Sequence, residues 1–140
     1  MIIAIRIRGL VGVRGKVEAT LQRLRLQKKF ACVVLNEDSE ISGMIKSVRE
    51  FLAYGKISSE TLKNLFIKRG RLYGNKPIPP QQVTEKFLED ALNGKVKEFK
   101  PFFALHPPKG GFKLPTRNFY PKGVLGDWKE DINKLVEIML

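Results

Sequence analysis

The first residues of the chain alternate between two sets of positions. One set carries three isoleucines and the other carries the charge: Ile3, Ile5 and Ile7 against Ala4, Arg6 and Arg8. A period of two is typical of a β-strand that has one face in the core and one in solvent. We therefore predict a half-buried strand over residues 2–8, with its arginines on the charged face.

A helix and a second strand are predicted next. After a glycine-bearing turn at residues 9–15, side chains recur at helical spacing: Val13, Val17, Thr20, Leu21 and Leu24. The run 31–35 is short and apolar, which favours a buried strand. Cys32 lies inside that run and is the one cysteine of the chain, so we expect a buried small hydrophobe and no disulfide.

The pattern up to residue 70 completes a βαβαβ unit and a third helix. The second helix has an apolar stripe formed by Ile41, Met44, Ile45 and Val48. Asp38 or Ser39 is its expected N-cap. A third strand is predicted around residues 51–56. Ser58 is expected to cap a helix that ends at Gly70.

Beyond residue 70 the pattern becomes irregular. A helix is predicted over residues 84–92, after several prolines. The segment 95–126 is rich in prolines and cations, which argues against regular structure. Its aromatic side chains predict that it becomes ordered against a partner or the domain. Asp127 is expected to cap a final helix whose stripe is Ile132, Leu135, Val136 and Met139.

The charge narrows the class of partner. Among 140 residues, 26 Lys and Arg stand against 14 Asp and Glu, which leaves a net charge of +12. Such an excess favours a polyanion, by default nucleic acid. The chain has no apolar run of about 18 residues and no basic-then-apolar leader, so we expect a cytosolic protein and no membrane partner.

The glycine turn leaves three interpretations open. Gly9, Gly12 and Gly15 lie between a predicted strand and helix, with Glu37 further on, which partly matches a dinucleotide-binding fingerprint. Both glycine intervals are three, whereas the fingerprint needs two and then three. A helix N-terminus beside Arg8 and Arg14 also suits an RNA phosphate. The turn can equally be structural.

Other candidate chemistry is weak. His106 is the one histidine and stands beside two prolines, so it has no second imidazole for a zinc site and no nearby serine for a nucleophilic pair. We interpret it as a hydrogen-bonding loop residue. Adjacent carboxylates, such as those at 130 and 131, are interpreted as solvated. The sequence therefore predicts no catalytic residue, metal site or cofactor.

Basic clusters carry the functional prediction. Lys68, Arg69 and Arg71 precede Lys76 at the end of the third helix, and Lys109 and Lys113 flank an aromatic residue in the irregular segment. Arg14 and Lys16 add charge to the glycine turn. Separate clusters on one small chain predict an extended RNA footprint dominated by phosphate contacts.

Several ordered motifs resemble a known family. They are Gly-Leu-Val-Gly-Val-Arg-Gly at 9–15, Leu-Asn-Glu-Asp at 35–38, Gly-Met-Ile-Lys-Ser-Val at 43–48, Lys-Arg-Gly-Arg-Leu at 68–72 and Leu-His-Pro-Pro-Lys-Gly-Gly at 105–111. Together they resemble the large-subunit ribosomal protein thirty family in its longer archaeal form, the counterpart of eukaryotic large-subunit protein seven. The resemblance spans nearly the whole chain.

The resemblance implies a fold and partners. The expected class is α+β, a ferredoxin-like βαβαβ core (residues 1–57) with a three-stranded antiparallel sheet and helices on one face. Residues 58–140 would form a helical and irregular extension packed on the core and on RNA as one structural unit. The implied partners are 23S rRNA, 5S rRNA and neighbouring ribosomal proteins, with no small-molecule substrate.

The resemblance also assigns RNA-facing regions. These are the turn 9–15 with Arg8, the second helix with Lys46 and Arg49, the cluster 68–76 and the loop 106–113 that includes His106. The leading hypothesis is a structural constituent of the large ribosomal subunit in the cytoplasm that binds and stabilises rRNA. The alternatives are a free-standing RNA-binding or RNA-processing regulator and a nucleotide-dependent enzyme, which would need a parallel sheet.

Overall fold

The main sheet confirms the predicted antiparallel core. The computed structural model describes residues 2–9, 12, 14–36, 38–72, 74, 76–79, 81, 83–92, 102–112, 115, 118–120 and 122–140. Among them the strand order is β6-β2-β1-β3-β7. The central strand β1 (Ile2–Arg6) runs antiparallel to both β2 (Ala31–Leu35) and β3 (Leu52–Lys56).

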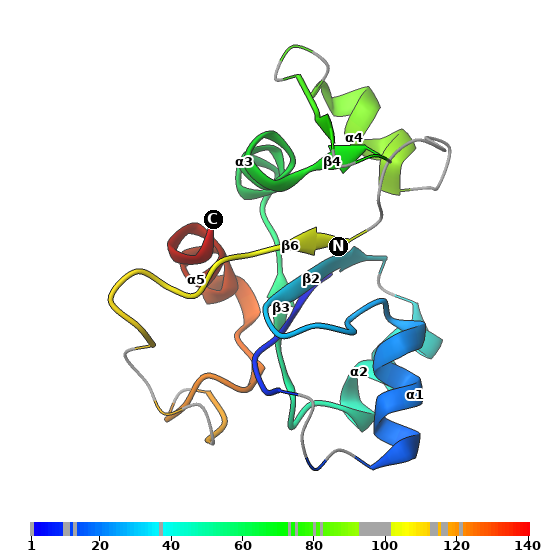
Figure 1. The fold of residues 1–140 in the computed structure, drawn as a ribbon, viewed down its shortest axis with the longest axis vertical. Helices are drawn as coiled ribbons and strands as arrows, with labels where there is room; N and C mark the ends of the chain where they lie inside the picture. The colour runs from blue at the N-terminus through cyan, green and yellow to red at the C-terminus, as the bar shows by residue number, and fades with distance from the viewer. Residues whose placement is uncertain are drawn as a thin grey trace.

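Two helices cover one face of this core sheet. They are α1 (Gly15–Arg23) and α2 (Ser39–Ser47), which lie together beside the strands (Figure 1). Asp38 is the N-cap of α2, but its side chain makes no capping hydrogen bond. The apolar stripes of both helices enter one core cluster, which consists of Ala4, Leu21, Leu24, Leu26, Ala31, Val33, Ile45, Val48 and Leu52. The expected placement of the core helices on one face is confirmed.

The later part of the chain covers the opposite face. Helices α3 (Ser59–Arg69) and α5 (Ile132–Met139) pack there with Leu88 of α4 (Glu85–Leu92). The Ser58 hydroxyl accepts a hydrogen bond from the Thr61 N–H (3.3 Å), which confirms the predicted cap of α3. The buried side chains of α5 are the predicted stripe, Ile132, Leu135, Val136 and Met139.

The second core cluster depends on close packing between the extension and β3. A Cβ atom added at Gly55 would lie 2.9 Å from the Ile132 side chain and would overlap the Lys129 carbonyl. Because real Cβ atoms need more room, only glycine allows α5 to begin so close to the strand. The Phe66 ring of α3 meets the Phe103 ring at 5.1 Å between centroids, edge to face.

The prediction that β1 has a charged face is wrong. Arg6 is 1% exposed, and Ala4 on the same side is fully buried under the helices. The extension covers the isoleucine side as well, so both faces of β1 are inside the protein. The alternating sequence pattern therefore reflects two different buried faces of β1, and one of these faces carries the cation Arg6. Arg8, beyond the end of the strand, is exposed as predicted.

The expectation of no regular structure in 95–126 is wrong at three places. Strand β6 (Phe103–Ala104) pairs with β2, and β7 (Gly126–Asp127) pairs in parallel with β3. Phe119 and Leu125 form a single bridge. Each pairing is too short to leave a periodic signal.

A separate hairpin, before the segment 95–126, consists of β4 (Arg71–Leu72) and β5 (Lys76–Pro77).

The predicted capping role of Asp127 also needs correction. Its carboxylate accepts a hydrogen bond from the Lys129 N–H (2.9 Å), at the start of a short 3-10 turn (Lys129–Asp131). Helix α5 begins only after that turn, with Asp131 as its N-cap residue. Asp127 therefore fixes the approach to the helix and not the helix end itself.

Candidate nucleic-acid interface

The turn after β1 and the end of α2 enclose a hollow of about 730 Å³. Its lining comes from both elements: Arg8, Gly9, Gly12, Arg14 and Val17 on one side, and Ser47, Glu50 and Phe51 on the other. Gly12 has a φ of 77°, a conformation that costs little only for glycine. The structure thus brings the predicted residues Arg8, Gly12 and Arg14 together around one concavity.

Arg8 is held in place by its neighbours. Its guanidinium carbon lies 5.4 Å from the centroid of the Phe51 ring. The Ile7 and Arg8 N–H groups both donate to the Phe51 carbonyl, at 2.9 and 3.4 Å. A guanidinium over an aromatic ring is attracted by the ring face and can still donate hydrogen bonds to oxygen acceptors. Arg8 is therefore a positioned, exposed cation at the edge of the hollow.

The N-terminus of α1 opens beside the same hollow. Arg14 is the N-cap residue and makes no side-chain capping bond, and Lys16 is exposed in the first turn. The first N–H groups of a helix lack intrahelical partners and carry the positive end of the helix dipole. The free N–H groups and the nearby cations can therefore bind a phosphate, whose oxygens accept the hydrogen bonds. Glu50 is the acid in the lining and limits the positive potential there.

The two predicted cations near the end of α2 have different surroundings. Lys46 is exposed in the last turn of the helix. Arg49 is also exposed, but its guanidinium carbon lies 5.5 Å from the centroid of the Phe119 ring. Phe119 belongs to the extension and is 44% exposed. Arg49 therefore joins the core to the extension while remaining at the surface.

The 68–76 cluster lies where α3 passes into the β4–β5 hairpin. Lys68 and Lys76 are exposed, whereas Arg69 and Arg71 are half-buried. Arg71 donates to the Gly70 carbonyl (3.0 Å), and the Nε of Arg69 is buried with no hydrogen-bond partner among the described residues. Gly70 ends α3 as predicted. This cluster presents cations from the last turn of α3 and from a hairpin with strands of two residues each.

The loop after β6 carries the third cluster. The His106 N–H donates to the Met139 carbonyl (3.1 Å), which ties the loop to α5 while the His106 and Lys109 side chains stay exposed. The Gly111 N–H closes a turn on the Pro108 carbonyl (3.0 Å). Lys113 lies outside the described residues.

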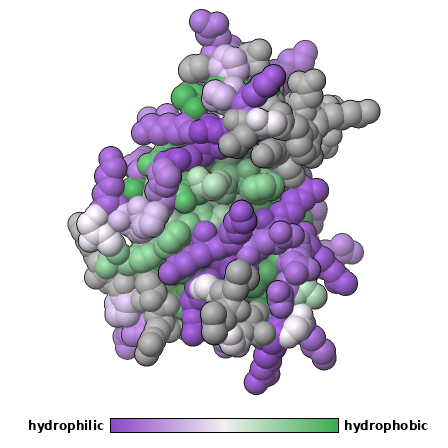
Figure 2. Space-filling view, viewed as in Figure 1, coloured by the Kyte–Doolittle hydropathy of each residue, from purple (hydrophilic) through white to green (hydrophobic). Residues whose placement is uncertain are grey.

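The clusters occupy separate edges of the molecule. The turn after β1 lies at the bottom of Figure 1, the β4–β5 hairpin near its top, and the loop after β6, in yellow, at its left. Hydrophilic side chains surround an apolar strip on the face seen in Figure 2. The cations therefore do not converge on one pocket, and an extended polyanion is the ligand that fits such an arrangement.

Sequence reasoning missed one basic segment. Lys28 and Lys29 are exposed on the loop between α1 and β2, next to the half-buried ring of Phe30. The Nζ of Lys29 lies 5.0 Å from the centroid of that ring, and Phe112 approaches it at 6.2 Å between centroids. The sequence signal that could have revealed this segment is the pair of adjacent lysines just before the predicted buried strand.

The pKa shifts of the following titratable groups have structural causes. Cys32 is fully buried, which confirms the predicted buried small hydrophobe, and its burial raises the pKa of the thiol. A hydrogen bond to the Asp131 carboxylate raises the pKa of Tyr120. The interpretation of this carboxylate as solvated therefore needs correction, because the Asp131 carboxylate accepts a hydrogen bond from the Tyr120 hydroxyl. Burial raises the pKa of Tyr54, with a contribution from Asp127 and opposition from Arg49.

The topology argues against a dinucleotide-binding site at the glycine turn. A dinucleotide site needs a parallel sheet at the glycine turn, but β1 is antiparallel to both neighbours. Glu37, the acidic residue of the partial fingerprint, lies outside the described residues. Within the described part of the chain, no group of His, Cys, Asp and Glu is arranged to hold a metal ion.

Among the described helices, none is both long enough and apolar enough to cross a bilayer.

Comparisons with known proteins agree with one another. The family model for ribosomal protein L30p/L7e matches residues 2–52. The large ribosomal subunit protein uL30 of Archaeoglobus fulgidus is 38% identical over 97% of both chains. Its namesakes from Methanococcus vannielii and Methanocorpusculum labreanum are 38% and 34% identical with the same coverage.

Proposed function

The chain belongs to the ribosomal protein L30p/L7e family, and from that premise we propose how it acts as a structural constituent of the large ribosomal subunit. Its exposed cations neutralise clustered phosphates and hold rRNA segments in place. Binding of this kind releases condensed counterions, so affinity falls as salt rises. As a ribosomal protein, the chain works in the cytoplasmic ribosome.

One observation carries the proposal. The hollow between the turn after β1 and α2 combines a guanidinium that lies over an aromatic ring, a glycine with positive φ and the open N-terminus of α1. These parts suit a phosphate on an RNA backbone. They do not suit a dinucleotide, because the sheet is antiparallel at this point.

The proposed RNA-binding residues extend beyond the hollow. They are Arg8, Gly12, Arg14, Lys16, Lys46, Arg49, Lys68, Arg69, Arg71, Lys76, His106, Lys109 and Lys113. The ion pair between Lys63 and Glu85 (3.6 Å) involves none of them. Lys113 stays in the set on sequence grounds alone.

The partners follow from the class of protein. We propose 23S rRNA as the main ligand and neighbouring ribosomal proteins as further contacts. Contact with 5S rRNA is a finer proposal, supported by cations on opposite edges, which can reach two RNA segments at once. The proposed function requires no catalytic activity and no cofactor.

The division of the chain is also a proposal. Residues 1–57 would form the core and residues 58–140 an extension packed on it and on RNA. Shared packing supports one structural unit, because Ile3 and Ile5 of β1 lie in the same cluster as Leu135 and Val136 of α5.

A binding titration tests the proposal. The full chain is titrated with a 23S rRNA transcript, a 5S rRNA transcript and an unrelated duplex RNA, each at several salt concentrations. We expect the ribosomal transcripts to bind more tightly than the duplex, with affinity falling linearly on logarithmic axes as salt rises. Equal affinity for all three RNAs would contradict specific rRNA binding and favour a general RNA-binding regulator.

A further inference from the structure

Arg6 is a buried cation at the last position of β1. It is 1% exposed. Its guanidinium donates to four backbone carbonyls: Arg8 (Nε, 3.0 Å), Leu26 (Nη1, 2.7 Å), Gln27 (Nη1, 3.2 Å) and Gly9 (Nη2, 3.4 Å). All four acceptors are peptide dipoles. A buried charge is tolerated when its donors are satisfied in this way.

The four carbonyls belong to two different surface segments. Residues 8 and 9 begin the turn that lines the hollow, and residues 26 and 27 belong to the loop between α1 and β2. The Arg6 carbonyl also accepts a hydrogen bond from the Phe30 N–H (2.7 Å). One residue therefore fixes both ends of that loop and joins it to the turn.

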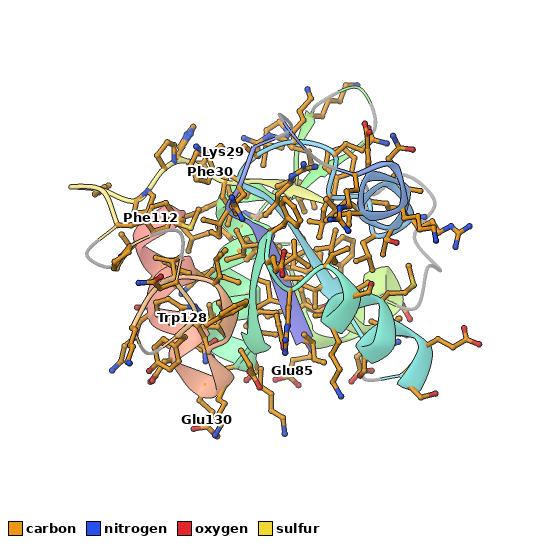
Figure 3. The ribbon with its side chains drawn as sticks, turned by 90° about the horizontal axis from the view of Figure 1, so that it is seen from below. Lys29, Phe30, Glu85, Phe112, Trp128 and Glu130 are labelled. Atoms are coloured by element: carbon orange, nitrogen blue, oxygen red, sulfur yellow. The ribbon has the colours of Figure 1, made fainter. Side chains whose placement is uncertain are left out.

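The loop, residues 25–30, has its own cations and is called the basic loop below. Arg25, Lys28 and Lys29 are all exposed. In Figure 3, Lys29 and Phe30 lie together near Phe112, in agreement with the ring contacts given above. None of the three cations was assigned to RNA by the family motifs.

The basic loop contains two residues in a backbone conformation that is unfavourable for residues other than glycine. Arg25 and Phe30 have φ values of 63° and 64°, in the left-handed region that non-glycine residues seldom adopt. Such residues persist where the surrounding structure over-determines them. Here the Leu105 N–H donates to the Phe30 carbonyl (3.1 Å), in addition to the bonds from Arg6. The cations of the loop are therefore presented in a fixed position.

We propose that Arg6 is a positioning residue that holds the turn after β1 and the basic loop as one RNA-binding surface, on which Arg25, Lys28 and Lys29 contact phosphates. This inference rests on the proposed function. Only a guanidinium has a planar fork of five donors that can serve carbonyls of two segments at once; an ammonium has three donors at one point. Burial lowers the pKa of Arg6 and Glu18 opposes that shift, yet arginine remains charged in proteins.

The first test uses Arg6→Lys in the full chain. Its affinity for a 23S rRNA transcript is measured against salt, at a temperature where circular dichroism shows the variant to be folded. We expect a loss of roughly tenfold to a hundredfold and a salt slope lowered by about two, because displaced cations neutralise fewer phosphates. A purely structural role would lower the melting temperature and leave the slope of the folded protein unchanged.

Double-mutant cycles provide a matched control. Arg6→Lys is combined with Lys29→Ala, on the basic loop, and separately with Arg71→Ala, on the distant hairpin. Losses that are less than additive with Lys29→Ala and additive with Arg71→Ala are expected, since coupled residues share one effect and separated residues do not. Additive losses in both cycles would overturn the positioning role.

A triple variant tests the surface without altering the core. Arg25, Lys28 and Lys29 are exposed, so replacing all three with Ala should preserve folding while lowering the salt slope by about three. An unchanged slope would overturn the inference even if Arg6→Lys failed to fold. If the unaltered chain showed no preference for the rRNA transcript, the proposed function itself would fail.

Discussion

The turn after β1 and the 68–76 cluster carry similar charge on very different supports. Arg8 lies over the Phe51 ring, and its backbone is hydrogen-bonded to the Phe51 carbonyl and to the Arg6 guanidinium. The 68–76 cluster instead extends from the last turn of α3 onto a hairpin with strands of two residues each. A cation that its neighbours already hold in place needs little further ordering when it binds, and the contacts of Arg8 give it such a support. We therefore expect the turn to set the register on RNA and the cluster to add affinity.

The largest expected effect comes from weakening the support of the cluster. Phe66 is fully buried in α3, within one turn of Lys68 and Arg69, and packs on Phe103 and Phe87. Phe66→Ala should lower the free energy of unfolding by about 3–5 kcal/mol. Urea unfolding measures this loss. In the folded fraction, RNA footprints should disappear at the hairpin and remain at the turn; loss at both would show that the two supports are not independent.

The next largest effect tests the turn directly. The double variant Arg8→Ala and Arg14→Ala should weaken binding to a 23S rRNA transcript roughly 30- to 100-fold at moderate salt, because two phosphate contacts disappear. Filter binding across salt concentrations provides the readout, with Lys63→Ala as a control outside the clusters. A loss no larger than the control would remove the turn from the interface.

A smaller effect is expected at the cluster. Replacing both Arg69 and Arg71 with Ala should weaken binding roughly tenfold and flatten the salt slope by about two. Arg71 already donates to the Gly70 carbonyl, and Lys68 and Lys76 remain nearby. Thermal stability should change little, since half-exposed charges contribute weakly to folding. If this double variant has the same salt slope as the unaltered chain, the cluster does not contact phosphate.

The smallest effect separates charge from position. Phe51→Leu keeps an apolar side chain but removes the ring beneath Arg8, which should weaken RNA binding by about 0.5–1 kcal/mol. The salt slope should stay constant, because Arg8 is still present. Isothermal titration at two salt concentrations measures both quantities. A slope reduced as much as in Arg8→Ala would mean that the ring is needed to keep the cation at the interface at all.

The core of the fold could be predicted because its signals are local. Helical stripes, the Ser58 cap and the buried run around Cys32 each depend on neighbouring residues. The cap and the buried run were found where expected, as were Leu21, Leu24, Ile45 and Val48 of the two stripes. The burial of Arg6 could not be predicted, since its four acceptors come from two segments brought together only by folding. Strands β6 and β7 were missed because pairing two residues long leaves no periodicity.

The sequence indicated where the basic clusters lie along the chain, and their role in binding RNA stays a prediction. What supports the cations could not be predicted, because the contacts of Arg8 with the Phe51 ring and of Arg49 with the Phe119 ring join residues that are distant in sequence. The basic loop was not included in the predicted set because Lys28 and Lys29 fall between two regular elements, where a pair of cations is ordinarily solvated.

Sedimentation tests the central claim most directly. Cell lysate is separated on sucrose gradients at moderate and at high salt, and each fraction is probed for this chain. The account predicts that the chain travels with the large ribosomal subunit at moderate salt and is released only at high salt, since phosphate contacts dominate its binding. A position at the top of the gradient at both salt concentrations would contradict a structural role in the subunit.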